Sequence, residues 1–174
     1  GFTWLSTAEY YRIINQEVSR RLGGFHSAKI LLYSVDFQEI EHLQREARWA
    51  EAGERIGEIA KILENAGAEI LILCTNTMHK VADCIENATN TLFIHIADAT
   101  GEEISKKGLK KVGLLGTRYT MEEDFYKGRL IDKFGLTVVI PPAEKRWFVN
   151  DVIFNELCHG VIKPVSKHQF EEII

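Results

Sequence analysis

The chain has 174 residues, with 45% hydrophobic and 26% charged side chains and a formal net charge of −4 at pH 7. This length can bury the core of one domain, or of two small domains that share an interface. The acidic balance and the scattered Lys and Arg residues exclude a nucleic-acid-binding footprint, and no apolar run is long enough to span a membrane. We therefore expect neither nucleic acid nor a membrane as a partner.

The three cysteines of the chain are Cys74, Cys84 and Cys158. An odd number of cysteines without metal-ligand spacing predicts free thiols in a reducing compartment, so we expect a cytoplasmic protein without a metal site. Cys84 and Cys158 both fall in predicted helices, which favours packing roles for these two side chains.

The first helix is predicted from Ala8 to Leu22, with Ser6 or Thr7 as its cap and Gly23 at its end. The loop before it is led by a glycine. In α/β proteins such a loop and helix normally follow a strand, and no strand precedes this one. We therefore expect that a first strand is missing from the amino end.

A strand is predicted at Lys29–Val35, followed by a helix that begins near Phe37. In that helix Phe37, Ile40 and Gln44 share one face, so Gln44 interrupts an otherwise apolar stripe. A glutamine at a partly wet edge explains this pattern, and a ligand contact is the alternative. A longer helix is predicted over residues 49–66.

The apolar run Glu69–Leu73 predicts a buried parallel strand that ends at Cys74, and a helical pattern begins at Met78. Open α/β sheets bind ligands at such strand ends, where a following helix offers free N–H groups and the positive end of its dipole. Both effects lower a cysteine pKa, so the pattern is typical of a reactive thiolate at Cys74. A small buried hydrophobe at a strand end is the alternative.

The rest of the chain continues the alternation of strands and helices. Strands are predicted at residues 91–96, 111–116 and 136–140, and helices at about 78–87, 98–107, 121–134, 147–158 and from 164 to the end. The segment that begins at Gly116 resembles the one that begins at Gly1, which predicts two similar α/β halves, residues 1–97 and 98–174. Gly113 and Gly116 do not complete a dinucleotide-binding fingerprint.

Several sequence blocks, in order along nearly the whole chain, resemble the aspartate/glutamate racemase family, specifically its bacterial amino-acid racemase branch. The first of them is Leu73–Lys80, with the sequence LCTNTMHK. The others are Gly1–Trp4, Gly23–Ala28, Ser34–Phe37, His95–Gly101 and Gly116–Met121.

The resemblance implies an α/β fold with two Rossmann-like halves, each a parallel sheet flanked by helices, and an active site in the cleft between them. It implies a racemase that uses no cofactor, neither pyridoxal phosphate nor a metal. One thiolate removes the α-proton of an amino acid, and an opposing thiol reprotonates the other face. Aspartate and/or glutamate is the implied small-molecule substrate, and a homodimer is the implied assembly.

Carried over by position, the resemblance implies that Cys74 is the catalytic acid/base of the first half. The implied substrate-binding residues are Phe2, Thr3, Gln44, Thr75, Asn76, Thr77 and Thr117, with backbone groups serving at the first two. Family members usually carry Met-Ser where this chain has Phe2-Thr3.

The family's second cysteine lies in a Gly-Cys-Thr-Glu motif, which residues 1–174 do not contain, and Cys158 lies at the wrong place in the strand–helix alternation. Together with the missing first strand, this predicts an incomplete copy of a racemase chain with poor activity by itself. Two alternatives stay open. One is a related cysteine-dependent decarboxylase or maleate-type isomerase, and the other is a catalytically dead protein that binds a small dicarboxylate.

Overall fold

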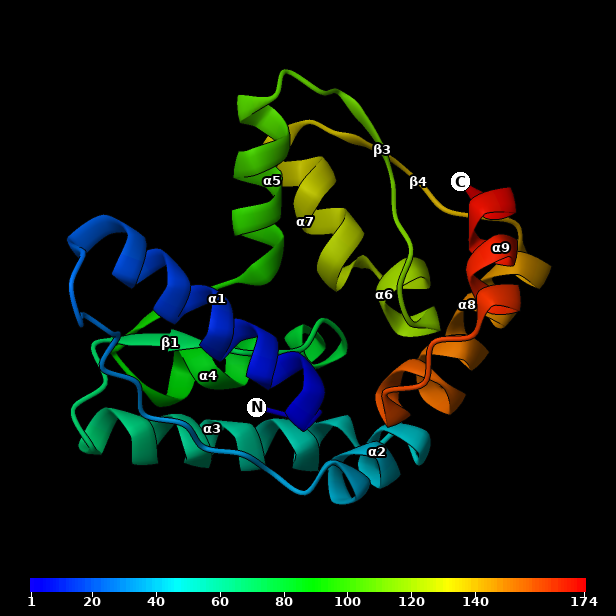
Figure 1. The fold of residues 1–174 in the computed structure, drawn as a ribbon. Coiled ribbons are helices and arrows are strands. Elements are labelled where there is room, and N and C mark those ends of the chain that lie inside the picture. The colour runs from blue at the N-terminus through cyan, green and yellow to red at the C-terminus, as the bar shows by residue number, and fades with distance from the viewer. The chain divides into compact units, whose positions relative to one another are not determined.

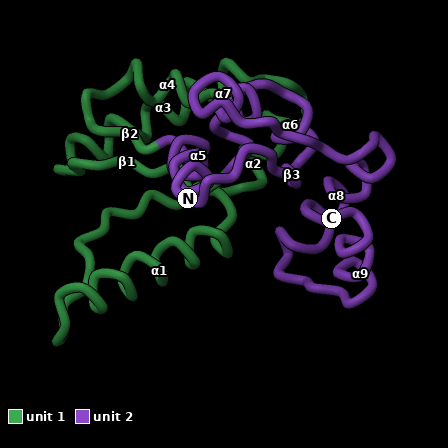
Figure 2. The backbone as a smooth tube through the Cα atoms, turned by 90° about the horizontal axis from the view of Figure 1, so that it is seen from above, with its two compact units in different colours: residues 1–75, 81–94 green, residues 76–80, 95–174 purple.

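The computed structural model describes residues 1–174, and the chain forms two compact units (Figures 1 and 2). The first unit comprises residues Gly1–Thr75 and Val81–Ile94, and the second comprises Asn76–Lys80 and His95–Ile174. Each unit contains a two-stranded parallel sheet flanked by helices, which confirms the predicted α/β class. The internal similarity of residues 1–97 and 98–174 stays a prediction.

The first unit is built around the parallel pair β1 and β2, whose register places Ile70 opposite Leu92 and Ile72 opposite Ile94. Its elements are α1 (Trp4–Leu22), α2 (Phe37–Arg45), α3 (Trp49–Asn65), β1 (Ile70–Ile72), α4 (Ala82–Ala88) and β2 (Leu92–Ile94). None of the helices of the protein combines the length and the apolar character that are needed to cross a bilayer.

Helices α3 and α4 pack closely against each other (Figure 1). Glycines on α3 allow this approach, because a Cβ added to Gly53 would lie 2.5 Å from the Cys84 sulfur, and one added to Gly57 would lie 3.0 Å from the Cys84 carbonyl oxygen. The thiol of Cys84 therefore serves as packing material between two helices, as its helical position predicted.

The strand predicted at Lys29–Val35 is wrong, because these residues form no strand in the structure. The backbone of this segment forms two hydrogen bonds with Gly1. The Gly1 amino group donates to the Tyr33 C=O at 2.6 Å, and the Gly1 C=O accepts from the Val35 N–H at 3.1 Å. A strand requires a ladder of successive hydrogen bonds, and the ladder of β1 is formed with β2. The apolar side chains of Leu31 and Leu32 are exposed.

The second unit is organised around the parallel pair β3 and β4, with Lys111 opposite Thr137. Its elements are η1 (Thr77–Val81, whose last residue belongs to the first unit), α5 (Ile96–Lys106), β3 (Lys111–Gly113), α6 (Arg118–Glu122), α7 (Asp124–Phe134), β4 (Thr137–Val139), α8 (Ala143–Asn155), η2 (Leu157–His159) and α9 (Pro164–Ile173). Its core includes Ala97 from α5, Tyr126 and Leu130 from α7, and Leu136.

The single helix predicted over residues 121–134 is broken at Glu123 into α6 and α7. The backbone of Glu123 is extended, and its carboxylate forms an ion pair with the Lys80 ammonium at 2.6 Å. This partner lies far away in the sequence, so no local pattern could indicate the break. The helix predicted over residues 78–87 likewise begins as the 3₁₀ turn η1 and becomes α-helical only in α4.

Helices α5 and α7 are joined by an ion-pair cluster around Asp98. Arg129 donates to both Asp98 carboxylate oxygens, at 2.6 and 2.9 Å, and Lys133 donates at 2.6 Å. The hydrogen bond from Arg129 is the main reason why the pKa of the Asp98 carboxyl lies well below its usual range, and Lys133 adds to the effect. The charged form of Asp98 therefore stabilises the folded state.

We predict that Asp98→Asn lowers the free energy of unfolding by about 1–2 kcal/mol at pH 7, because it removes a charged acceptor of three hydrogen bonds. A depressed pKa contributes stability above the unfolded value of about 3.9 and loses it as the pH falls further. Urea titrations should therefore show a constant difference between pH 5 and 7 that shrinks below about pH 4.

The matched control is Asp132→Asn on the exposed side of α7. It should change the free energy of unfolding by no more than about 0.5 kcal/mol. An Asp98→Asn penalty that persists unchanged in strong acid would show that charge does not cause it.

Candidate functional site

Cys74 lies just beyond the carboxyl end of β1, in a segment without regular secondary structure. The Ser6 hydroxyl, from the first turn of α1, lies 3.1 Å from the Cys74 carbonyl oxygen and 3.2 Å from that of Thr3, and it donates to these acceptors. The Thr75 N–H donates to Leu73 C=O at 2.8 Å, which turns the chain sharply at Cys74. The amino end of α1 therefore holds the cysteine loop within the first unit.

The expected low pKa of Cys74 is wrong. Burial raises the pKa of the Cys74 thiol above its ordinary value, and the nearby amino terminus at Gly1 offsets only part of this effect. The α-helix that was expected directly after β1 is also absent, because the residues after Cys74 form a loop and then the 3₁₀ turn η1. Desolvation thus outweighs favourable charge.

Three threonine hydroxyls form a cluster in the second unit. Thr77 Oγ1 lies 2.9 Å from Thr117 Oγ1, which lies 3.1 Å from Thr120 Oγ1. Thr117 Oγ1 also accepts the Thr120 N–H at 3.3 Å as the cap of α6. Because two hydroxyl protons close the two bonds among three hydroxyls, the third proton is left to point at another acceptor, such as a carboxylate.

The other residues of the first unit that are implied to bind the substrate differ in burial and hydrogen bonding. The side chain of Phe2 is only 4% exposed and belongs to the core, so only its backbone is available. The Thr3 hydroxyl donates to Ser6 Oγ at 3.0 Å at the start of α1. Gln44 is also only 4% exposed, on the inner face of α2, so the interpretation as a residue at a partly wet edge is wrong.

Thr75 is half-buried and Asn76 is exposed. The Asn76 C=O accepts the His79 N–H at 3.0 Å, which starts η1. The structure therefore brings Thr77 and Thr117 together directly, and Ser6 to Cys74. Ser6 and Thr120 were not among the implied contacts, and only their local contacts, with hydroxyl residues three positions earlier at a helix start, have a signal in the sequence.

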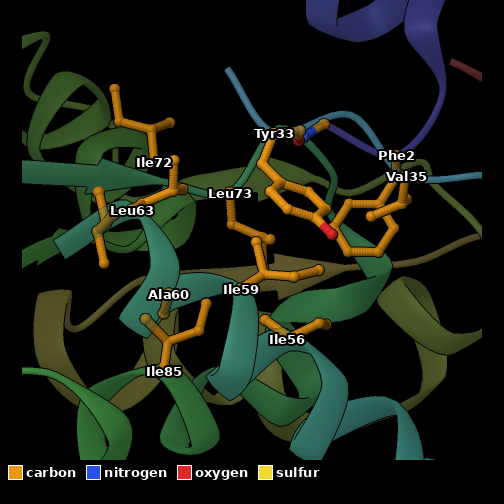
Figure 3. A pocket seen from close by; sticks show the side chains of 12 residues that line it. Phe2, Tyr33, Val35, Ile56, Ile59, Ala60, Leu63, Ile72, Leu73 and Ile85 are labelled. Atoms are coloured by element: carbon orange, nitrogen blue, oxygen red, sulfur yellow. The ribbon is translucent and has the colours of Figure 1, made fainter. Parts of the chain in front are cut away.

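An apolar pocket lies beside β1 in the first unit, with about 430 Å³ not filled by protein atoms and partly open to solvent. Figure 3 shows its wall of aliphatic side chains from α3, with Tyr33, Phe2 and Leu73 across from them. Removing a carboxylate from water into such a lining is costly, so this pocket is not a site for an acidic amino acid.

Arg118 follows Thr117 directly, and its guanidinium lies over the Trp147 ring, 4.7 Å from the ring centre. Its backbone N–H donates to Asn150 Oδ1 at 2.9 Å. Arg45 and Arg48 are exposed and, like Arg118, paired with neighbouring glutamates. No group of three or more His, Cys, Asp or Glu side chains is arranged to hold a metal ion.

The parallel strands with flanking helices, and a loop with a thiol and hydroxyls at a strand end, define an α/β protein of the kind that handles small molecules at its strand ends. Comparison with protein families matches residues 1–174 to the Asp/Glu/Hydantoin racemase family. The chain belongs to this family.

Solved structures agree with this assignment. A Yersinia pestis protein described as a candidate Asp/Glu racemase is 52% identical, with a TM-score of 0.91 over 100% of this chain and 76% of that one. An aspartate racemase homologue from Pyrococcus horikoshii is 36% identical, with a TM-score of 0.75 over 94% of this chain and 71% of that one. The Picrophilus torridus aspartate racemase, 20% identical with a TM-score of 0.68 over 100% and 71%, shares the fold.

We predict that Cys74 is alkylated by iodoacetamide with a pH midpoint above the ordinary cysteine value of about 8.5, because desolvation disfavours the thiolate. The rate at Cys74 should therefore still rise between pH 8.5 and 9.5. Peptide mass spectrometry separates this thiol from Cys84 and Cys158. A midpoint near pH 7 would contradict the effect of burial.

Proposed function

We propose that the protein is an amino-acid racemase that acts on aspartate and/or glutamate without pyridoxal phosphate, with Cys74 as one acid/base. The match of the racemase family to residues 1–174 carries this proposal, and the placement of Cys74 at the end of β1 supports it. The same family and the named relatives support racemase chemistry more strongly than decarboxylation or ligand binding alone.

The reaction requires a base at the α-proton and donors for the charge that follows. The Cys74 thiolate takes the α-proton, and the electron pair of the C–H bond moves into the carboxylate to give an enediolate-like intermediate. Donors aimed at that developing charge lower the barrier. The hydroxyls of the Thr77, Thr117 and Thr120 cluster are suited to a different task, which is to bind the carboxylate of the substrate equally before and during this step.

Inversion requires an acid that delivers a proton to the opposite face. Neither other cysteine of residues 1–174 is suited to this, because Cys84 packs against α3 and Cys158 lies in η2, outside any strand-end loop. We propose that the second thiol belongs to the Gly-Cys-Thr-Glu motif of the family, which residues 1–174 do not contain. Residues 1–174 alone should then racemise aspartate poorly.

We predict that Cys74→Ser lowers the rate of α-proton exchange of aspartate in D₂O by about 10²–10⁴-fold, because a serine hydroxyl is a far weaker base at neutral pH. Proton NMR of the α-hydrogen measures the exchange for each enantiomer. Cys158→Ser is the control and should exchange at the wild-type rate. Unchanged exchange in Cys74→Ser would overturn the proposal.

We also predict that Thr77→Val and Thr117→Val each raise the KM for aspartate by about tenfold or more. The two substitutions should not be additive, because each one breaks the same hydroxyl contact of 2.9 Å. Steady-state α-proton exchange in D₂O by the single and double variants measures the coupling. The isosteric change Thr137→Val, at an exposed position on β4, is the control. Fully additive effects would show that the two hydroxyls act independently.

A further inference from the structure

Two histidine rings pack edge to face inside the second unit, close in sequence to the residues proposed for substrate binding. The side chains of His79 and His95 are only 2% and 4% exposed. Their ring centres lie 4.4 Å apart, with an angle of 66° between the ring planes. His79 comes from η1, and His95 comes from the residue just before α5.

Both rings accept hydrogen bonds from the first turn of α5. The Ile96 N–H donates to His79 Nε2 at 3.2 Å, and the Ala97 N–H donates to His95 Nδ1 at 3.1 Å. A ring nitrogen that accepts an N–H carries no proton, so His79 is the neutral tautomer with its proton on Nδ1, and His95 the one with its proton on Nε2. The two histidines therefore meet α5 through different ring nitrogens.

The bond to His79 is long-range, whereas the bond to His95 is a local helix cap. His79 stands two residues after Thr77 in the same short turn, which the His79 N–H closes onto Asn76 C=O at 3.0 Å. A displacement of the His79 ring consequently displaces the turn, and with it the Thr77 hydroxyl that meets Thr117.

We propose that His79 is a positioning residue which, by accepting the Ile96 N–H, holds Thr77 in contact with Thr117. The inference rests on the proposed function, since it assigns substrate binding to that hydroxyl pair. His79 acts through Thr77 and is not a base for the reaction, because the ring nitrogen nearest to α5 is already engaged and the ring is enclosed by protein.

The two tautomers allow a crossed test with isosteric amides. A glutamine places an amide oxygen near the position of a histidine Nε2, and an asparagine places one near the position of Nδ1. His79→Gln should therefore keep the acceptor for Ile96, and His79→Asn should lose it. At His95 the preference should be the reverse, because Ala97 requires the Nδ1 position. His168→Asn, on the exposed side of α9, is the matched control.

In kinetics of α-proton exchange of aspartate in D₂O, His79→Asn should raise KM by about tenfold, which corresponds to the loss of one hydrogen bond, and leave kcat within a few-fold of wild type. His79→Gln should return KM to within about threefold of the wild-type value. The alkylation rate of Cys74 should be the same in all of these variants. Equal KM values for the Gln and Asn variants, or a fall in Cys74 alkylation, would overturn the inference.

The role of His79 can also be tested on the wild-type protein, so that the test does not depend on whether a variant folds. NMR should detect coupling through the hydrogen bond between the Ile96 amide nitrogen and His79 Nε2, and its absence would overturn the inference. If the wild type neither exchanges the α-proton of aspartate nor binds it, the racemase proposal fails by itself. The positioning role is then judged by the Thr77 and Thr117 amide shifts, which should move in His79→Asn and return in His79→Gln.

Discussion

The parallel pairing of β1 with β2 is the constraint on which the candidate site depends. Parallel neighbours end at the same edge of their sheet, so the chain that leaves β1 and the chain that leaves β2 start side by side. The segments that follow both contribute to the second unit. There the ring of His79, from the first segment, reaches the Ile96 N–H of the second. Within the second unit, this contact joins two segments that lie 17 residues apart in the sequence.

Burial of Cys74 has two opposite effects on its capacity to act as a base. A raised pKa lowers the fraction of thiolate at neutral pH, but it also makes the thiolate that forms a stronger base. Removal of a weakly acidic α-proton needs base strength as well as population. The half-buried thiol therefore fits proton abstraction better than it fits the role of a permanently ionised nucleophile, for which a low pKa is the usual adaptation.

The sequence predicted those elements whose signal is local. The apolar run before Cys74 and the run at residues 136–140 became β1 and β4 because each is short, β-branched or aliphatic, and bounded by turn residues. The same signal at Lys29–Val35 failed, since pairing depends on a partner that the pattern of one segment cannot specify. The prediction of one continuous helix over residues 121–134 failed for a related reason. Glu123, where the helix breaks, pairs with Lys80, which lies 43 residues away in the sequence.

The features of the candidate site also differ in whether they could be predicted from the sequence. The cysteine loop and the threonines near it were identified through the racemase resemblance, and a direct contact between Thr77 and Thr117 then appeared in the structure. The pKa of Cys74 could not be predicted, because it depends on burial by residues distant in the sequence. The roles of His79 and His95 depend on which ring nitrogen meets which N–H, and no sequence pattern encodes that choice.

The histidines also bear on the proposal that hydroxyls bind the substrate. Helix amino ends in α/β proteins commonly bind anions with their free N–H groups. In α5, however, the Ile96 N–H is taken by His79, the Ala97 N–H by His95 Nδ1, and the Asp98 N–H by the His95 C=O at 3.0 Å. With this first turn occupied, these N–H groups are not available to the carboxylate of the proposed substrate. The threonine cluster is the donor that we propose instead, and its hydroxyls carry no fixed charge that would hold a substrate too tightly before the reaction.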